Sequence, residues 1–145
     1  MIDAREYLSS FRKAEARLKL KIQQLQDLQD RLTSFSAPMD RELVSHTKNT
    51  GTMADTIAIV LDMKNEISSQ SSEIIRRKQE AYGLLDQISP ENAIILMAHY
   101  FEGESLTQLG NRLHIVKRTA QRRLNDALEE FQDVLDRYDR LHSAN

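Results

Sequence analysis

The chain has no cysteine and no tryptophan, and it contains few glycines, prolines and aromatic residues. Its 145 residues include four glycines and two prolines, and 6% of them are aromatic. Without cysteine, neither a disulfide scaffold nor a thiolate metal site can form. Because Gly and Pro are the main helix breakers, their scarcity predicts an all-α protein with few interruptions.

Long hydrophobic runs are also missing. No stretch approaches the roughly 20 apolar residues that are needed to cross a bilayer. The first residues, MIDAREYLSSFRKAEA, interleave charges where a signal peptide has an apolar run. We therefore expect no membrane contact and no secretion, with the cytoplasm as the compartment.

The sequence contains no recognisable catalytic or metal-binding motif. Neither an HExxH nor a Walker-type segment occurs. The histidines share no helical metal spacing: His46, His99, His114 and His142. Adjacent acids such as Glu129 and Glu130 diverge on a helix, which suits solvent better than acid–base catalysis. We predict a non-enzyme without catalytic residues, metal or cofactor, in which His99 is a partly buried helix residue and His114 a turn residue.

Charge is nearly balanced overall, with a net charge of −2, but it is unevenly distributed. Between Glu104 and Asn125, five basic residues stand against one acid, whereas from Asp126 onward six acids stand against two basic residues. A charge run by itself usually marks a solvated helix face. The basic segment therefore indicates a function only because it coincides with a sequence motif.

That motif lies between Leu106 and Leu128. Apolar residues recur there at helical spacing on both sides of a short interruption, and the small Gly110 stands where two helices must approach closely. The apolar positions are Leu109, Leu113, Ile115, Ala120, Leu124, Ala127 and Leu128. This spacing predicts a helix-turn-helix.

The side chains between these apolar positions are suited to reading double-stranded DNA. Arg and Lys contact guanine edges or phosphates, and Gln and Asn pair with adenine. The predicted DNA-binding residues are Lys117, Arg118, Thr119, Gln121, Arg122, Arg123 and Asn125.

From Pro90 onward the sequence resembles region four of bacterial sigma-70-type factors, the domain that reads the promoter −35 element. The matching features are Pro90 opening a helix, the turn Tyr100–Gly103, and the pairs Leu109–Gly110, Thr119–Ala120, Arg123–Leu124 and Ala127–Leu128. The chain departs from the family at His114, where Gly is usual, and at Val116, where Ser or Thr is usual. Val116 cannot cap a helix, and Lys117 and Arg118 are unfavourable beside a positive helix N-terminus. We expect the start of this recognition helix to be weakly ordered until phosphates neutralise it.

The N-terminal part carries heptad repeats, which predict two long helices from Asp3 to about Leu32 and from about Met53 to Gln87. A polar loop is expected over about 33–52. The first repeat comprises Leu8, Phe11, Leu18, Ile22, Leu25 and Leu32, with Glu15 and Gln29 at polar positions. The second comprises Ile57, Val60, Ile67, Ile74, Ala81, Leu85 and Ile88, broken by Lys64, Ser71 and Lys78.

Two such helices can pair within one chain as an antiparallel coiled-coil hairpin, or between chains, and periodicity does not distinguish these cases. We favour a hairpin that associates further into a homo-oligomer. The predicted domains are 1–88, the hairpin, and 89–145, the helix-turn-helix domain. Its last helix is expected to continue to about His142, and this extension would serve either internal packing or dimerisation.

As a whole the chain is similar to the ArpU-like late transcriptional regulators of phages of low-GC Gram-positive bacteria. The similarity includes the REYL segment Arg5–Leu8 and the run Ile57–Ile67. It implies a sequence-specific activator of late phage genes for packaging, structure or lysis, acting with host RNA polymerase in the bacterial cytoplasm. Two alternatives remain: a DNA-packaging protein of small-terminase type, and a region-four-like module that binds RNA polymerase or a sigma factor.

Overall fold

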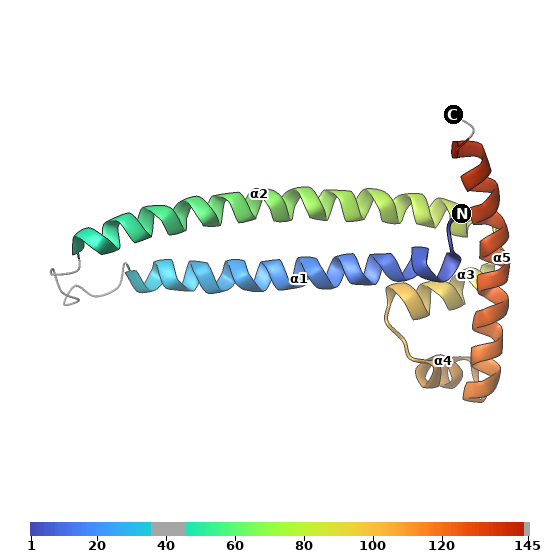
Figure 1. Ribbon diagram of the computed structural model, residues 1–145. Helices are drawn as coiled ribbons and strands as arrows, with labels where there is room; N and C mark the ends of the chain where they lie inside the picture. Colours follow the sequence, from blue (N-terminus) through green and yellow to red (C-terminus); the bar gives the residue numbers. More distant parts are fainter. Residues whose placement is uncertain (36–45, 144–145) are drawn as a thin grey trace. The chain divides into compact units, whose positions relative to one another are not determined.

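The computed structural model describes residues 1–35 and 46–143, and every element within these residues is helical (Figure 1). This confirms the all-α prediction. In chain order the elements are α1 (Ala4–Phe35), α2 (His46–Leu85), α3 (Pro90–Leu96), the π-helix η2 (Met97–Phe101), α4 (Leu106–Leu113) and α5 (Lys117–Ser143). None of the helices in this described part of the chain combines the length and apolar content of a bilayer-spanning segment.

The long helices extend further into the predicted loop than their heptad patterns indicated. The polar loop predicted over about 33–52 is wrong at both ends, since α1 continues to Phe35 and α2 begins at His46. Once a helix has formed, each further residue adds a backbone hydrogen bond, and Ser, Thr and Asn cost well under 1 kcal/mol each in a helix. Polar composition alone therefore did not end these helices. The remainder of the predicted loop, 36–45, lies outside the described residues.

The chain divides into two compact units, and this division differs from the predicted one. A central unit comprises Glu15–Glu73, and a terminal unit combines Met1–Ala14 with Ile74–Asn145. The prediction placed the boundary between 88 and 89. It assigned the start of α1 and the end of α2 to the N-terminal domain. In the structure, these two segments belong to one unit with α3, α4 and α5.

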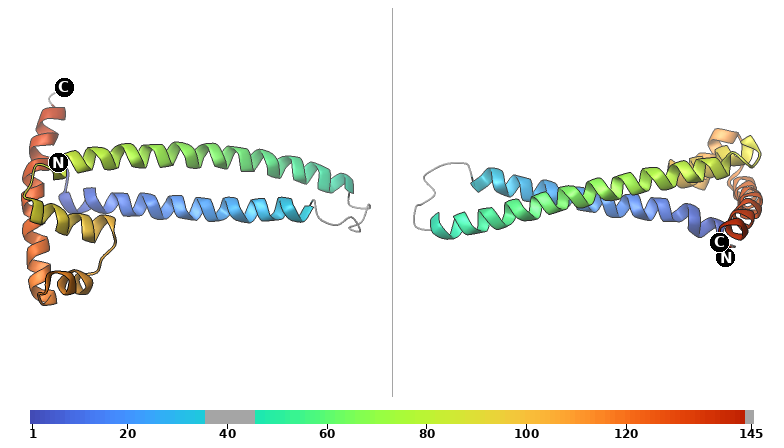
Figure 2. Two further views of the ribbon diagram at one scale, coloured as in Figure 1. Left: turned by 180° about the vertical axis from the view of Figure 1, so that it is seen from behind. Right: turned by 90° about the horizontal axis from the view of Figure 1, so that it is seen from above.

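In the central unit, α1 and α2 run antiparallel and side by side (Figures 1 and 2). Buried and half-buried residues recur along each helix at intervals of three and four: Leu18, Lys21, Leu25, Leu28 and Leu32 on α1, and Met53, Thr56, Val60, Met63, Ile67 and Gln70 on α2. These rows form the facing seams. The predicted seams were wrong at Ile22 and Ile57, which are 38% and 43% exposed.

Polar pairing accompanies two of the polar seam residues. Lys21 forms an ion pair with Glu66 across the two helices, and the same Glu66 carboxylate accepts a hydrogen bond of 3.2 Å from Gln70 Nε2. A polar seam residue is tolerated when a partner satisfies it. A pattern that counts only apolar residues passes over Lys21 and Thr56 and selects their apolar neighbours, Ile22 and Ile57, instead.

The terminal unit has one continuous apolar core. Its buried members are Ala4, Leu8, Leu84, Leu85, Ile88, Ile95, Leu96, Ala98, Tyr100, Leu109, Ala120, Leu124, Ala127, Leu128, Phe131, Val134 and Leu135. Both α3 and α4 pack against α5. The extension of α5 reaches Ser143, close to its predicted end, and Phe131, Val134 and Leu135 are buried within the chain itself. These three residues of the extension therefore serve internal packing.

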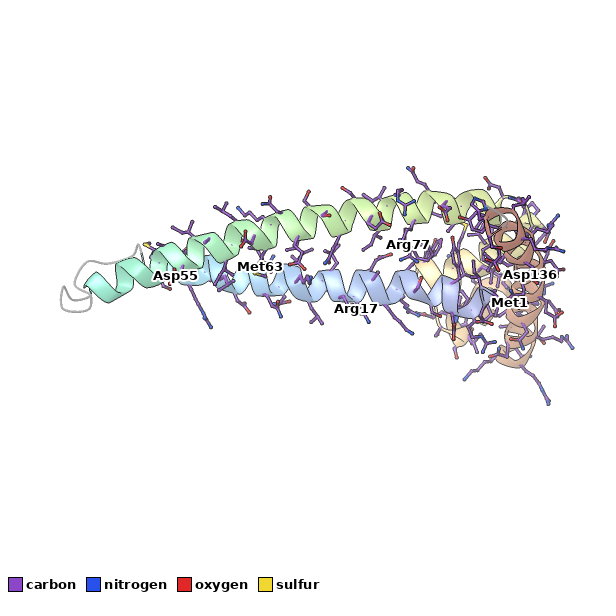
Figure 3. All side chains as sticks on the ribbon, turned by 45° about the horizontal axis from the view of Figure 1, so that its top comes forward. Met1, Arg17, Asp55, Met63, Arg77 and Asp136 are labelled. Carbon is purple, nitrogen blue, oxygen red and sulfur yellow. The ribbon has the colours of Figure 1, made fainter. Side chains whose placement is uncertain are left out.

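Hydrogen bonds attach the first turn of α1 to α5. Gln132 Oε1 accepts the Ala4 N–H at 2.8 Å, and Gln132 Nε2 donates to the Ile2 carbonyl at 2.7 Å. Arg77 of α2, labelled in Figure 3, donates to Ser10 Oγ at 2.8 Å. The first residues of the chain are thus a structural part of the unit that contains α4 and α5.

Candidate nucleic-acid interface

The start of α4 is fixed by a reciprocal pair of hydrogen bonds. Ser105 Oγ accepts the Gln108 N–H at 3.1 Å, and Gln108 Oε1 accepts the Ser105 N–H at 2.8 Å. Together they satisfy two backbone donors that would otherwise lack partners at the helix end. This capping box stabilises the first turn of α4, the helix that precedes the turn to α5.

A three-residue turn, His114–Val116, joins α4 to α5. His114 is confirmed as a turn residue, and its backbone is left-handed, with φ 59° and ψ 44°. The Ile115 N–H donates to the Gly110 carbonyl at 2.9 Å, so the turn folds back on α4. A Cβ at Gly110 would lie 2.8 Å from the Ile115 carbonyl oxygen. The expected close approach at Gly110 is therefore present, and its partner is the backbone of the turn.

Val116 stands at the N-cap position of α5. Its carbonyl accepts the Ala120 N–H at 3.0 Å, the first bond of the helix. Its side chain is 69% exposed and offers no oxygen to the free N–H groups of the first turn. The start of α5 therefore lacks a side-chain cap at its N-cap residue.

Replacing Val116 with serine should raise the free energy of unfolding of the terminal unit by about 1 kcal/mol, because serine supplies the missing acceptor and little apolar burial is lost. All four tyrosines, Tyr7, Tyr82, Tyr100 and Tyr138, belong to this unit, and the chain has no tryptophan. Urea unfolding followed by tyrosine fluorescence therefore measures it directly. Val116→Ala is the control, since alanine cannot cap. Equal stability of the two variants would contradict the capping argument.

The first turns of α5 present one apolar side and one polar side. Ala120 and Leu124 are buried in the core. Arg118, Arg122 and Asn125 are exposed, and their spacing of four and three residues places them on one helix face, away from the core. This face is the one that the sequence predicted for DNA contact.

Of the other predicted DNA-binding residues, Lys117 and Gln121 border this face. Lys117 is exposed at the first position of α5, and the half-buried Gln121 donates to Asn125 Oδ1 at 3.0 Å. Thr119, half-buried, and Arg123, exposed, are four residues apart and lie on another side of the helix. The seven predicted residues therefore do not form one face: Thr119 and Arg123 lie apart from Arg118, Arg122 and Asn125.

Ion pairing separates the basic residues into two groups. Arg112 of α4 lies 2.7 Å from Glu104 and 3.4 Å from Glu102, so its charge is compensated inside the unit. Within the described residues, the basic side chains of α5 that precede Asn125 form no ion pair: Lys117, Arg118, Arg122 and Arg123. Uncompensated positive charge is thus concentrated on the first two turns of α5.

Glu130 has a structural role that the sequence did not indicate. Its carboxylate accepts hydrogen bonds from Asn92 Nδ2 at 2.6 Å and from the Ser89 N–H and hydroxyl at 3.2 and 3.1 Å. The bond from Asn92 is the main reason that the pKa of Glu130 lies below its usual value. Pro90 opens α3 as predicted, and Glu130 attaches that helix start to α5. Its adjacency to Glu129 gave no hint of this partner, which is some forty residues away.

No protein family, characterised protein or solved structure matched the chain. Among the residues that the structure describes, there is no group of at least three His, Cys, Asp or Glu side chains that could hold a metal ion. The geometry of the α4–α5 turn and the uncompensated basic face of α5 are therefore the basis for assigning a function.

Proposed function

We propose that this protein is a sequence-specific, double-stranded DNA-binding transcription regulator, and that α4, the turn and α5 act as a helix-turn-helix. The observation that carries the proposal is the exposed Arg118 and Arg122 face, which is uncompensated and follows directly after the tight turn at His114. In this arrangement the N-terminal part of the second helix enters the major groove.

The side chains of the α5 face match the chemistry of base edges. Arg118 and Arg122 are suited to guanine or to phosphate, and Asn125 and Gln121 to adenine. The exposed Glu129, four residues after Asn125, adds negative charge on the same side of the helix and limits how far the duplex can follow α5. The reading segment is therefore short, about two helical turns.

A short reading segment gains affinity when two copies act together. Two rigidly linked copies contact half-sites about 34–36 Å apart, and each copy adds its own phosphate contacts. In this proposal the central unit is a coiled-coil hairpin that mediates self-association, and the operator is pseudopalindromic. The resemblance to ArpU-like regulators and to sigma region four extends the proposal to activation of late phage genes with host RNA polymerase.

A gel-shift titration with DNA from the chain's own genome, upstream of late genes, tests this function. The double variant Arg118→Ala/Arg122→Ala should bind at least about 30-fold more weakly than the wild type, because each lost base contact costs about 1–3 kcal/mol. The matched control is Arg137→Ala/Arg140→Ala, which removes two exposed arginines from the far end of the same helix. The control should bind like the wild type.

Other results would favour other functions. Equal affinity for random DNA would overturn sequence-specific reading and favour a packaging protein. Absence of DNA binding, combined with capture of RNA polymerase or a sigma factor, would favour the interaction module. A monomer at micromolar concentration would contradict the pseudopalindromic operator.

A further inference from the structure

We infer that a groove beside α5 binds a backbone phosphate of the DNA, which makes the start of α1 part of the nucleic-acid interface. The inference rests on the proposed function and adds to it a second contact region. The groove is open, has a volume of about 300 Å³ and belongs entirely to the terminal unit. Its lining residues are Arg5, Ser9, Arg12, His99, Tyr100, Leu106, Gln121 and Leu124.

The lining of this groove is basic and contains no acidic residue. Arg5 and Arg12 are seven residues apart on α1, two helical turns, so that both point to the same side. Both are exposed, and within the described part of the chain neither forms an ion pair. A neighbouring groove, by contrast, is lined by Asp3 and Glu129 as well as Arg5. The groove that Arg5 and Arg12 line therefore favours an anion, whereas the neighbouring groove, which shares Arg5, also contains two carboxylates.

His99 and Ser9 complete the polar lining of the groove. His99 Nδ1 lies 2.7 Å from the Glu104 carbonyl oxygen, which can only accept, so Nδ1 carries the proton and the ring is oriented. The Ser9 hydroxyl is a further donor in the lining. Arginine forks match phosphate oxygens in bidentate geometry. The two arginines and the Ser9 hydroxyl therefore suit one phosphate group, and the oriented His99 ring forms part of the groove wall.

Gln121 connects this groove to the reading face of α5. It lines the groove and also donates to Asn125, which is exposed on that face. A phosphate in the groove would therefore lie next to the DNA strand whose bases the α5 face reaches. Contacts of this kind set orientation and affinity and carry no sequence information. The start of α1 would then act as a backbone clamp.

The test is a salt titration of DNA binding with the variant Arg5→Gln/Arg12→Gln, in which glutamine keeps part of the side-chain stem and removes the charge. Affinity for specific and for random DNA should fall by the same factor, about tenfold or more, with base preference unchanged. The slope of log affinity against log salt should become shallower by about 1, because one phosphate contact is lost. The matched control is Lys13→Gln/Arg17→Gln, which removes two exposed charges from the same helix outside the groove.

Failure of this inference and failure of the proposed function give different results. If the wild type binds no DNA, the function itself is wrong. If the wild type binds specifically and Arg5→Gln/Arg12→Gln binds equally well with the same salt slope, the groove does not contact DNA. A second arm measures the melting temperature in millimolar inorganic phosphate. A shift in the wild type that the variant lacks, together with unaltered DNA binding, would assign the groove to a free phosphate compound and overturn the DNA contact.

Discussion

Replacing Leu8 with alanine should destabilise the terminal unit by about 2 to 5 kcal/mol, although Leu8 lies more than a hundred residues before the α4–α5 turn. The Leu8 side chain is fully buried in the same core as Phe131 and Leu135 of α5. Truncation leaves a cavity among these residues and weakens the packing that holds α5. We therefore expect DNA binding to be lost at a lower temperature than in the wild type.

Leu20→Ala is the matched control, since it makes the same chemical change on the same helix at a position that is 64% exposed. It should alter stability by no more than about 0.5 kcal/mol. Tyrosine fluorescence during urea unfolding gives the stability of the terminal unit for both variants. Equal midpoints for Leu8→Ala and the wild type would show that α1 does not contribute to that unit.

This expectation could not have come from the sequence, because heptad periodicity reports which face of a helix is apolar and not which partner covers it. Leu8 and Leu25 both belong to the apolar seam of the predicted repeat. In the structure Leu8 is buried in the core of the terminal unit, while Leu25 is half-buried on the α2-facing side of the central unit. The change of partner occurs within one uninterrupted helix, so no break in the pattern marks it.

The local geometry of the α4–α5 region was more predictable, because it depends on neighbours in the sequence. Positive φ at His114, the close approach at Gly110 and the outward direction of Arg118 and Arg122 all follow from a few adjacent residues. Contacts from distant elements were not predictable in this way. The bonds from Ser89 and Asn92 to Glu130, and the groove that Arg5 and Gln121 both line, depend on the tertiary fold.

Gly110 provides the sharpest test of the turn geometry. Alanine is the better helix former by about 1 kcal/mol, so Gly110→Ala would stabilise α4 if space allowed. Its Cβ would, however, lie 2.8 Å from the carbonyl oxygen of Ile115 and 3.7 Å from the backbone nitrogen of Lys117. Both are backbone atoms, one in the turn and one in the first residue of α5, so they cannot move away as a flexible side chain could. We expect a net loss of stability of about 1 to 3 kcal/mol, as is typical of overpacking.

Gly83→Ala is the opposite case within the same unit. Gly83 also lies in a helix, but no atom of a neighbouring segment is within 4 Å of the Cβ that alanine would add there. This variant should gain up to about 1 kcal/mol from helix propensity. The two substitutions are chemically identical, so opposite shifts in the urea midpoint of tyrosine fluorescence isolate the steric contact at the turn. A gain of stability in both variants would mean that the Ile115 carbonyl oxygen lies farther than 2.8 Å from the Cβ position of residue 110. The turn would then not fix the placement of α5 against α4.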